Sequence, residues 1–275
     1  MIQVVSDIKR CMALDGYSLL RSRALKLVLL LPTLAVVVRV MSARWLFSDD
    51  NEVVSGYGFL VDAWSTGFIV LYPVLAGVSA YSFAFERDCG AARHYLIRSA
   101  GRVSALFAKF LNLVILGLSA LVLCSTVSIL MTSMFWDFLA VVEDGFELIG
   151  VDEIHFELRQ GFLLALVTLP AVIGLGLLCS VLTNSAMQAV ATTLGVSVVV
   201  DVFKTQLGDM GRWFFSFYQP ALIDTSYLGE VAKIVRGYSD VLVSDQHILM
   251  NWWIPPVQAV FLMCVACLVI RRKRM

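Results

Sequence analysis

The chain has 275 residues, of which 59% are hydrophobic and only 15% are charged. Soluble domains are about 45–50% apolar and about a quarter charged, so one globular core cannot bury this many apolar side chains. The 21 basic and 21 acidic residues balance, which gives no support to a nucleic-acid partner. Disordered chains, collagen and small disulfide scaffolds are excluded, and the composition indicates an integral membrane protein.

The first element, over residues 1–24, is predicted to be a short amphipathic helix. Apolar residues recur at helical spacing from Val4 to Leu20, while Asp7, Lys9 and Arg10 fall on the opposite face. A basic amphipathic helix beside a span usually lies in the inner membrane interface. We therefore expect an interfacial anchor, and a second interpretation is that the helix also borders a cytoplasmic partner.

Six apolar windows follow this helix. A bilayer core about 30 Å thick is crossed by roughly 20 mostly apolar helical residues. The apolar runs are continuous rather than alternating, which favours helices over a β-barrel. The predicted spans are residues 25–46, 63–84, 106–130, 161–182, 186–203 and 252–270. The chain is thus predicted to be one all-α transmembrane domain over residues 1–275.

The distribution of basic residues predicts the orientation of these spans. The N-terminal segment, the connection after the second span and the C-terminal tail hold 14 of the 21 basic residues but only 4 of the 21 acidic ones. Basic segments are retained in the cytoplasm, so both termini are predicted to be cytoplasmic. The first apolar stretch is too long for a signal-peptide core and lacks a small-residue cleavage site, which indicates a retained anchor.

The segment after the second span, residues 85–105, is the most informative part of the sequence. Basic residues alternate there with the apolar triplet Tyr95-Leu96-Ile97, and Gly90 and Gly101 bracket a short predicted helix. The basic residues in and just after it are Arg87, Arg93, Arg98, Arg102 and Lys109. One interpretation is an ordinary positive-inside loop. Apolar side chains rimmed by charge favour a docking surface instead.

Two longer segments are predicted on the outer side. Residues 131–160 form an acidic loop, which could attract a cationic solute but is also the ordinary counterpart of basic inner loops. Residues 204–251 are expected to contain an amphipathic outer helix of about 16 residues, from Tyr227 to Leu242, with an ion pair between Arg236 and Asp240.

No motif for catalysis or nucleotide binding occurs in the chain. The three histidines fall in three separate loops, and the chain has no Gly-Lys dipeptide, which excludes a phosphate loop of the Walker A type. We therefore expect a protein that is not an enzyme and has no cofactor of its own. Ion-coupled transport is an alternative, but it usually needs ionisable groups deep in the bundle. Arg39 and Asp201 lie instead where they can reach the interface.

A characteristic run of residues follows the second span, and a tight inner turn at 184–186 follows the fourth span. The residues of that run are Phe83, Glu86, Arg87, Asp88, Gly90, Ala91, Leu96, Arg102 and Lys109. With this run the chain resembles the permease subunit of ABC-2 type ATP-binding-cassette transporters. The resemblance covers nearly the whole chain, from the interfacial helix through six spans to a basic tail.

The resemblance implies a coupling helix in residues 85–105 that docks on a separate ATPase subunit. ATP and Mg²⁺ would then be bound by that partner. The expected interface residues are Glu86, Arg87, Asp88, Arg93, Tyr95, Leu96, Ile97, Arg98 and Arg102. The resemblance also implies that a second copy or a related permease completes the transporter. It further implies a location in a bacterial cytoplasmic membrane and the export of a peptide, lipid, glycan or drug. The alternative is a membrane-embedded sensor or assembly subunit without a transport path.

Overall fold

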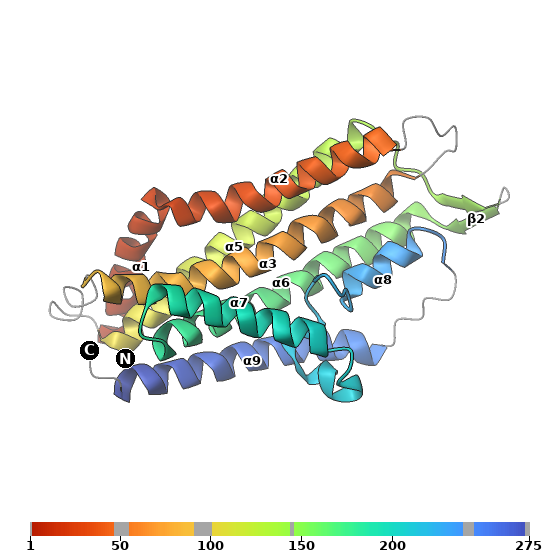
Figure 1. Cartoon of the computed structure of the whole chain (residues 1–275). Coiled ribbons are helices and arrows are strands. Elements are labelled where there is room, and N and C mark those ends of the chain that lie inside the picture. The colour runs from red at the N-terminus through yellow and green to blue at the C-terminus, as the bar shows by residue number, and fades with distance from the viewer. Residues whose placement is uncertain (1, 47–54, 91–100, 144–145, 239–244, 273–275) are drawn as a thin grey trace.

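The computed structural model describes residues 2–46, 55–90, 101–143, 146–238 and 245–272. The described chain is almost entirely helical, with one small antiparallel hairpin (Figure 1). Its α-helices are α1 (Ile2–Arg21), α2 (Arg23–Leu46), α3 (Gly56–Asp88), α5 (Arg102–Ser133), α6 (Val151–Leu182), α7 (Ala186–Phe203), α8 (Tyr227–Ile234) and α9 (Asp245–Arg272). The hairpin strands are β1 (Val141–Glu143) and β2 (Phe146–Ile149), and the 3-10 helices are η1 (Gly208–Trp213) and η2 (Phe215–Phe217).

The predicted number of membrane-spanning helices is confirmed. Within the described ranges, six helices are long and apolar enough to cross a membrane: α2, α3, α5, α6, α7 and α9. Each predicted window lies inside one of them. The start of α1 and the end of α9 lie together at one end of the bundle, and the hairpin and α8 lie at the other (Figure 1). We call these the proximal and the distal end.

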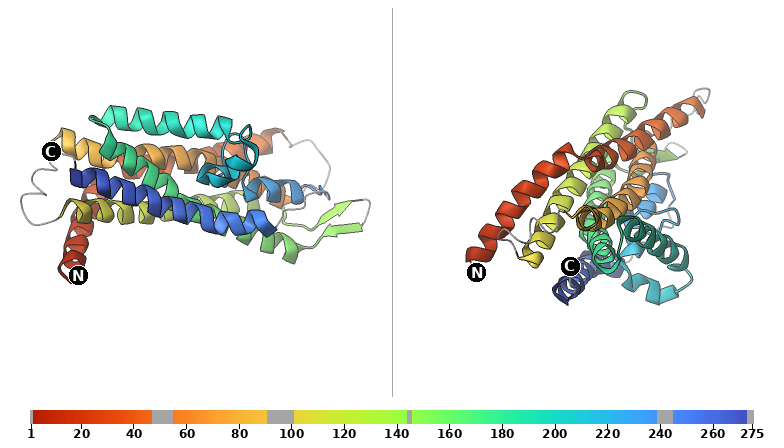
Figure 2. Two further views of the ribbon diagram at one scale, coloured as in Figure 1. Left: turned by 90° about the horizontal axis from the view of Figure 1, so that it is seen from below. Right: turned by 60° about the vertical axis from the view of Figure 1, so that its left-hand side comes forward.

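Helices α3, α5 and α6 lie at the centre of the bundle, and α2, α7 and α9 lie around them (Figure 2). In their most apolar windows, α6, α3 and α5 are 61%, 50% and 44% buried, whereas α9, α2 and α7 are 28%, 22% and 17% buried. The central helices contribute large, fully buried side chains such as Phe68, Leu71 and Leu169. The outer faces of the other three carry exposed leucines and valines, as expected for helices that contact lipid.

Helices α3 and α6 pack closely because small residues lie where they cross. A Cβ atom added at Gly176 would lie 2.7 Å from the carbonyl oxygen of Ala76 and 1.8 Å from Ser79 Oγ. Further along, the Tyr72 hydroxyl donates to the carbonyl oxygen of Ala165 at 2.7 Å and lies 2.8 Å from Thr168 Oγ1. Small residues and interhelical hydrogen bonds are the usual means by which helices associate in lipid.

A proline lies inside each of α2, α3 and α6, at Pro32, Pro73 and Pro170. Proline lacks the N–H group that would bond the carbonyl of the preceding turn. The helices continue through all three positions. Each of them therefore has one main-chain hydrogen bond fewer than a proline-free helix would have.

The sequence predicted that residues 131–160 form an acidic loop, but much of this segment has regular secondary structure. It contains the hairpin, and α6 begins at Val151, ten residues before the predicted span. Asp152 and Glu153 occupy the first turn of α6, where the helix dipole favours acidic side chains. Ile154 and Leu158 are buried one turn apart and continue the packed face of the helix. The predicted span did not include this first part of α6, because charged residues lower the mean hydropathy there.

The outer helix predicted from Tyr227 to Leu242 is also wrong in length. Helix α8 ends at Ile234, and Gly237 follows with φ of 85°. The N–H groups of Gly237 and Tyr238 donate to the carbonyl oxygens of Ile234 and Lys233, at 2.9 and 3.2 Å. This is the glycine-terminated cap that commonly ends helices. The amphipathic spacing of the sequence extends past Gly237, but the helix has already ended at Ile234.

The close crossing of α3 and α6 yields a stability prediction. Substitution of Gly176 by alanine places a methyl group against a backbone carbonyl, so we expect the free energy of unfolding to fall by about 1–3 kcal/mol. The measurement is the apparent melting temperature of the purified protein in detergent. Gly195→Ala on α7 is the matched control, because no atom lies within 4 Å of its added Cβ. Equal melting temperatures for the two variants would contradict the prediction.

Candidate functional site

The last turn of α3, Glu86–Asp88, lies at the proximal end directly before the connection to α5. Each of its three side chains contacts a different neighbour. Glu86 contacts α5, Arg87 contacts the end of α6, and Asp88 contacts the start of α7. This turn is the candidate functional site, because it joins the central helices to the segment that sequence analysis singled out.

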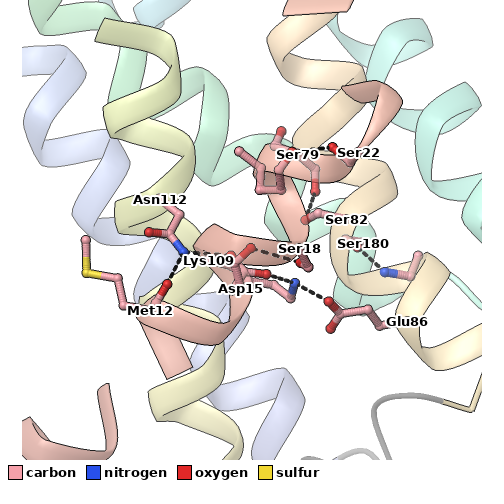
Figure 3. A network of polar contacts seen from close by, with 12 residues as sticks. Met12, Asp15, Ser18, Ser22, Ser79, Ser82, Glu86, Lys109, Asn112 and Ser180 are labelled. Carbon is pink, nitrogen blue, oxygen red and sulfur yellow. Dashed lines mark hydrogen bonds and ion pairs between the residues drawn. The ribbon is translucent and has the colours of Figure 1, made fainter. Parts of the chain in front are cut away.

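Glu86 belongs to a buried charge cluster that also includes α1 and α5 (Figure 3). Lys109 Nζ on α5 donates to Glu86 Oε1 at 2.6 Å and to Asp15 Oδ1 on α1 at 2.5 Å. The Lys109 side chain is 6% exposed, compared with 11% for Asp15 and 20% for Glu86. One cation therefore joins three helices, with two carboxylates opposite it.

Asn112 lies one turn beyond Lys109 on α5 and also forms hydrogen bonds to α1. Its Nδ2 atom donates to Asp15 Oδ2 at 2.9 Å and to the carbonyl oxygen of Met12 at 3.0 Å. Both oxygens of the Asp15 carboxylate are thus hydrogen-bonded, as a buried carboxylate needs to be. Helix α1 is consequently fixed to α5 by specific hydrogen bonds as well as by its apolar face.

Burial at this contact also affects a thiol of α1. Cys11 lies one turn before Asp15 and is buried. Burial raises the pKa of the Cys11 thiol above its ordinary value, and the nearby Asp7 and Asp15 carboxylates act in the same direction. A thiol with a raised pKa stays protonated at neutral pH and is a poor nucleophile, so Cys11 is a packing residue.

Arg87 and Asp88 join the same turn to α6 and α7. Arg87 Nη1 donates to the carbonyl oxygen of Ser180 at 3.5 Å, near the end of α6. Asp88 Oδ2 accepts a hydrogen bond of 2.7 Å from the N–H group of Ala186, the first residue of α7. The Ser185 hydroxyl caps the same helix by accepting from Gln188 N at 3.3 Å. A carboxylate at this position also complements the positive end of the helix dipole.

Not all residues of the expected interface lie in the described ranges. Glu86, Arg87 and Asp88 occupy the last turn of α3, and the half-buried Arg102 is the first residue of α5. Arg93, Tyr95, Leu96, Ile97 and Arg98 lie outside the described residues, as does the short helix expected between Gly90 and Gly101. Contact with an ATPase therefore stays a prediction for all nine residues.

Sequence analysis underestimated the ionisable residues inside the bundle. Lys109 was noted only as the residue opening the third span, and Asp15 was not singled out. A signal for Asp15 was available, because it falls on the apolar face of α1 between Cys11 and Leu19, which are buried and partly buried. A carboxylate at such a position predicts a buried cationic partner.

A second charge cluster, at the distal end, was also missed. Asp62 on α3 accepts from Arg39 Nη2 on α2 at 2.9 Å and from Arg236 Nη2, just after α8, at 2.6 Å. Arg236 thus pairs with α3, whereas the expected partner Asp240 lies outside the described residues. Asp201, the other ionisable residue noted in the spans, lies 2.6 Å from the buried Lys204 ammonium.

The described residues contain no group of three or more His, Cys, Asp or Glu side chains that could hold a metal ion. The chain was compared with protein-family models, with curated proteins and with solved structures, and none of the three comparisons gave a match. Function therefore has to be argued from the residues and their geometry.

The buried cluster yields a second prediction. Lys109→Met leaves the Asp15 and Glu86 carboxylates buried without their cation, so we expect a loss of about 3–5 kcal/mol in the free energy of unfolding. The measurement is thermal or denaturant unfolding in detergent. Lys26→Met, at an exposed position near the start of α2, is the matched control and is expected to unfold like the wild type.

The variant Lys109→Met/Asp15→Asn/Glu86→Gln separates charge from packing. Removing both carboxylate charges along with the lysine should recover part of the lost stability, because no uncompensated charge remains. A triple variant less stable than Lys109→Met would contradict the electrostatic explanation.

Proposed function

We propose that this chain is the transmembrane permease subunit of an ABC-2 type ATP-binding-cassette exporter. In this proposal it forms half of an export path together with a second copy or a related permease. A separate ATPase subunit binds ATP and Mg²⁺. The observation that carries the proposal is the Glu86–Asp88 turn, whose three side chains contact α5, α6 and α7 directly before the segment expected to dock.

The mechanical argument follows from these contacts. Closure of an ATPase dimer can move a membrane domain only through a contact that is itself held firmly. A force applied to residues 89–101 reaches Glu86, Arg87 and Asp88 first, and from there it reaches the other helices through ion pairs and hydrogen bonds. The Lys109 cluster adds α1, so this one turn of α3 is connected to four other helices: α1, α5, α6 and α7.

Connection lengths support the same segment as the docking site. At the proximal end, α6 and α7 are joined by residues 183–185 alone, which are too few to enter a groove on another protein. The α3–α5 connection is much longer. It combines Tyr95, Leu96 and Ile97 with the basic residues Arg93 and Arg98. In the proposal the apolar triplet enters a groove on the ATPase, and the arginines pair with its acidic rim.

The positive-inside bias assigns the proximal end to the cytoplasm in this proposal, and thiol labelling tests that orientation. Cys89 is exposed at the end of α3. In a variant whose other five cysteines are replaced by alanine, a membrane-impermeant maleimide should label Cys89 in inverted vesicles but not in intact cells. An Asp137→Cys substitution, between α5 and β1, in a background whose six native cysteines are all replaced by alanine should give the reverse pattern. Labelling of Cys89 from outside would overturn the orientation.

Copurification tests the proposed partner. The tagged chain is extracted from its native membrane in mild detergent, and bound proteins are identified by mass spectrometry. We expect a stoichiometric soluble ATPase with a phosphate-binding loop, and we expect Leu96→Asp to abolish its binding because a carboxylate is driven into an apolar groove. Leu148→Asp on β2, which is 43% exposed at the distal end, is the control and should retain the ATPase.

The possible outcomes distinguish the two hypotheses from sequence analysis. A folded preparation without any ATPase would overturn the ABC proposal and favour a sensor or assembly subunit. Retention of the ATPase by Leu96→Asp would leave the class intact but overturn the docking assignment. In that case the charged side chains of the Glu86–Asp88 turn and Arg102 become the next positions to substitute.

A further inference from the structure

A cavity of about 800 Å³ lies at the distal end, between β2 and the first turns of α6 and α9, with α8 and the residues after it as a further wall. Its size is within the range of small-molecule sites in proteins, roughly 300–1,000 Å³. The Glu86–Asp88 turn at the proximal end does not line this cavity. The cavity is also separate from the Asp62 cluster, whose residues do not line it.

The charged side chains among the described residues that line this cavity are all acidic. Glu153 and Glu157 lie one turn apart on α6, and Asp245 begins α9, whereas no lysine, arginine or histidine is found among those described lining residues. Among the described residues, no basic group lies within 4.0 Å of the Glu153 or Asp245 carboxylate. The basic residues in and just after α8 are already paired, since Arg236 contacts Asp62 and Lys233 contacts Glu230. The cavity thus has negative charge that the protein itself does not neutralise.

The rest of the lining is apolar and aromatic. Phe156 on α6, Trp252 on α9 and Tyr238 after α8 are 63%, 45% and 62% exposed. The buried Tyr227 also lines the cavity, and its hydroxyl donates a hydrogen bond to the Glu157 carboxylate. That bond orients one carboxylate on the wall. Exposed aromatic side chains gathered around a concavity indicate a binding site rather than ordinary surface.

We propose that this cavity binds an organic cation with an apolar body. The carboxylates supply the charge complement, and the aromatic faces attract a cation through their quadrupoles while also burying its apolar groups. An anion would meet three carboxylates of like charge. A hard metal ion would need several oxygen ligands around one point, and the described residues contain no group of three or more His, Cys, Asp or Glu side chains that could hold one. The inference does not rest on the proposed ATPase partner, because it concerns the opposite end of the bundle.

A pair of ions with the same shape and opposite charge provides the test. Tetraphenylphosphonium and tetraphenylborate are offered to the protein in nanodiscs of uncharged lipid, and binding is measured by equilibrium dialysis with empty nanodiscs subtracted. We expect saturable binding of the phosphonium that weakens as salt is raised, because salt screens the carboxylates. No saturable binding of the borate is expected.

Substitutions locate the binding. Glu153→Gln and Asp245→Asn keep the side-chain shape and remove one charge each, so each should weaken phosphonium binding by about two- to fivefold. Trp252→Ala should weaken it by roughly tenfold, because an aromatic face is lost. Asp152→Asn is the matched control. It removes the same charge from the same turn of α6 at a position that does not line the cavity, and it should bind like the wild type.

The outcomes are decisive in both directions. Preference for the phosphonium, together with weakening by the lining variants and not by Asp152→Asn, supports the proposal. Equal binding of the two ions, or the same loss for Asp152→Asn as for Glu153→Gln, would overturn it. A preference for the phosphonium that survives Trp252→Ala and the double variant Glu153→Gln/Asp245→Asn would place the binding elsewhere and overturn it as well.

Discussion

The Lys109 ammonium is the feature on which the proximal half of this bundle depends. A lysine that is 6% exposed in an apolar helix is tolerated only with compensating charge, and the two carboxylates that supply it come from α1 and α3. This requirement fixes the position of α1 against α5 and the last turn of α3 against both. Apolar packing has no directional requirement, whereas these ion pairs and hydrogen bonds each need a defined partner at a defined position.

The same arrangement explains why α3 is the organising helix. Its centre packs against α6 through small residues, its proximal turn contacts α5, α6 and α7, and Asp62 near its distal end binds Arg39 and Arg236. Polar contacts at both ends of a helix, with apolar packing between, suit a membrane, because water and lipid headgroups tolerate partial exposure there. Specific polar partners therefore hold both ends of α3, so a shift of the helix along its axis would disturb contacts at both ends.

Much of the fold could be predicted from the sequence, because a membrane span needs only length and apolarity. The six spans follow from these two properties, and the structure confirms their number. The distal start of α6 and the end of α8 could not be predicted in this way, since a packed face and a glycine cap decided them. The Lys109 cluster depends on pairing of Lys109 with Glu86 and Asp15, which lie 23 and 94 positions away in the chain, and local patterns do not contain such pairings.

The prolines of α3 and α6 lie at the same level of the bundle, since Tyr72, next to Pro73, is hydrogen-bonded to Ala165 and Thr168, just before Pro170. Each proline leaves a carbonyl without its main-chain donor, so bending a helix there disrupts fewer hydrogen bonds than bending it elsewhere. These two of the three central helices thus share a proline level between the Glu86–Asp88 turn and the acidic cavity. A bend of α3 and α6 at that level would leave the Lys109 and Asp62 ion pairs closed, because these pairs lie on opposite sides of it.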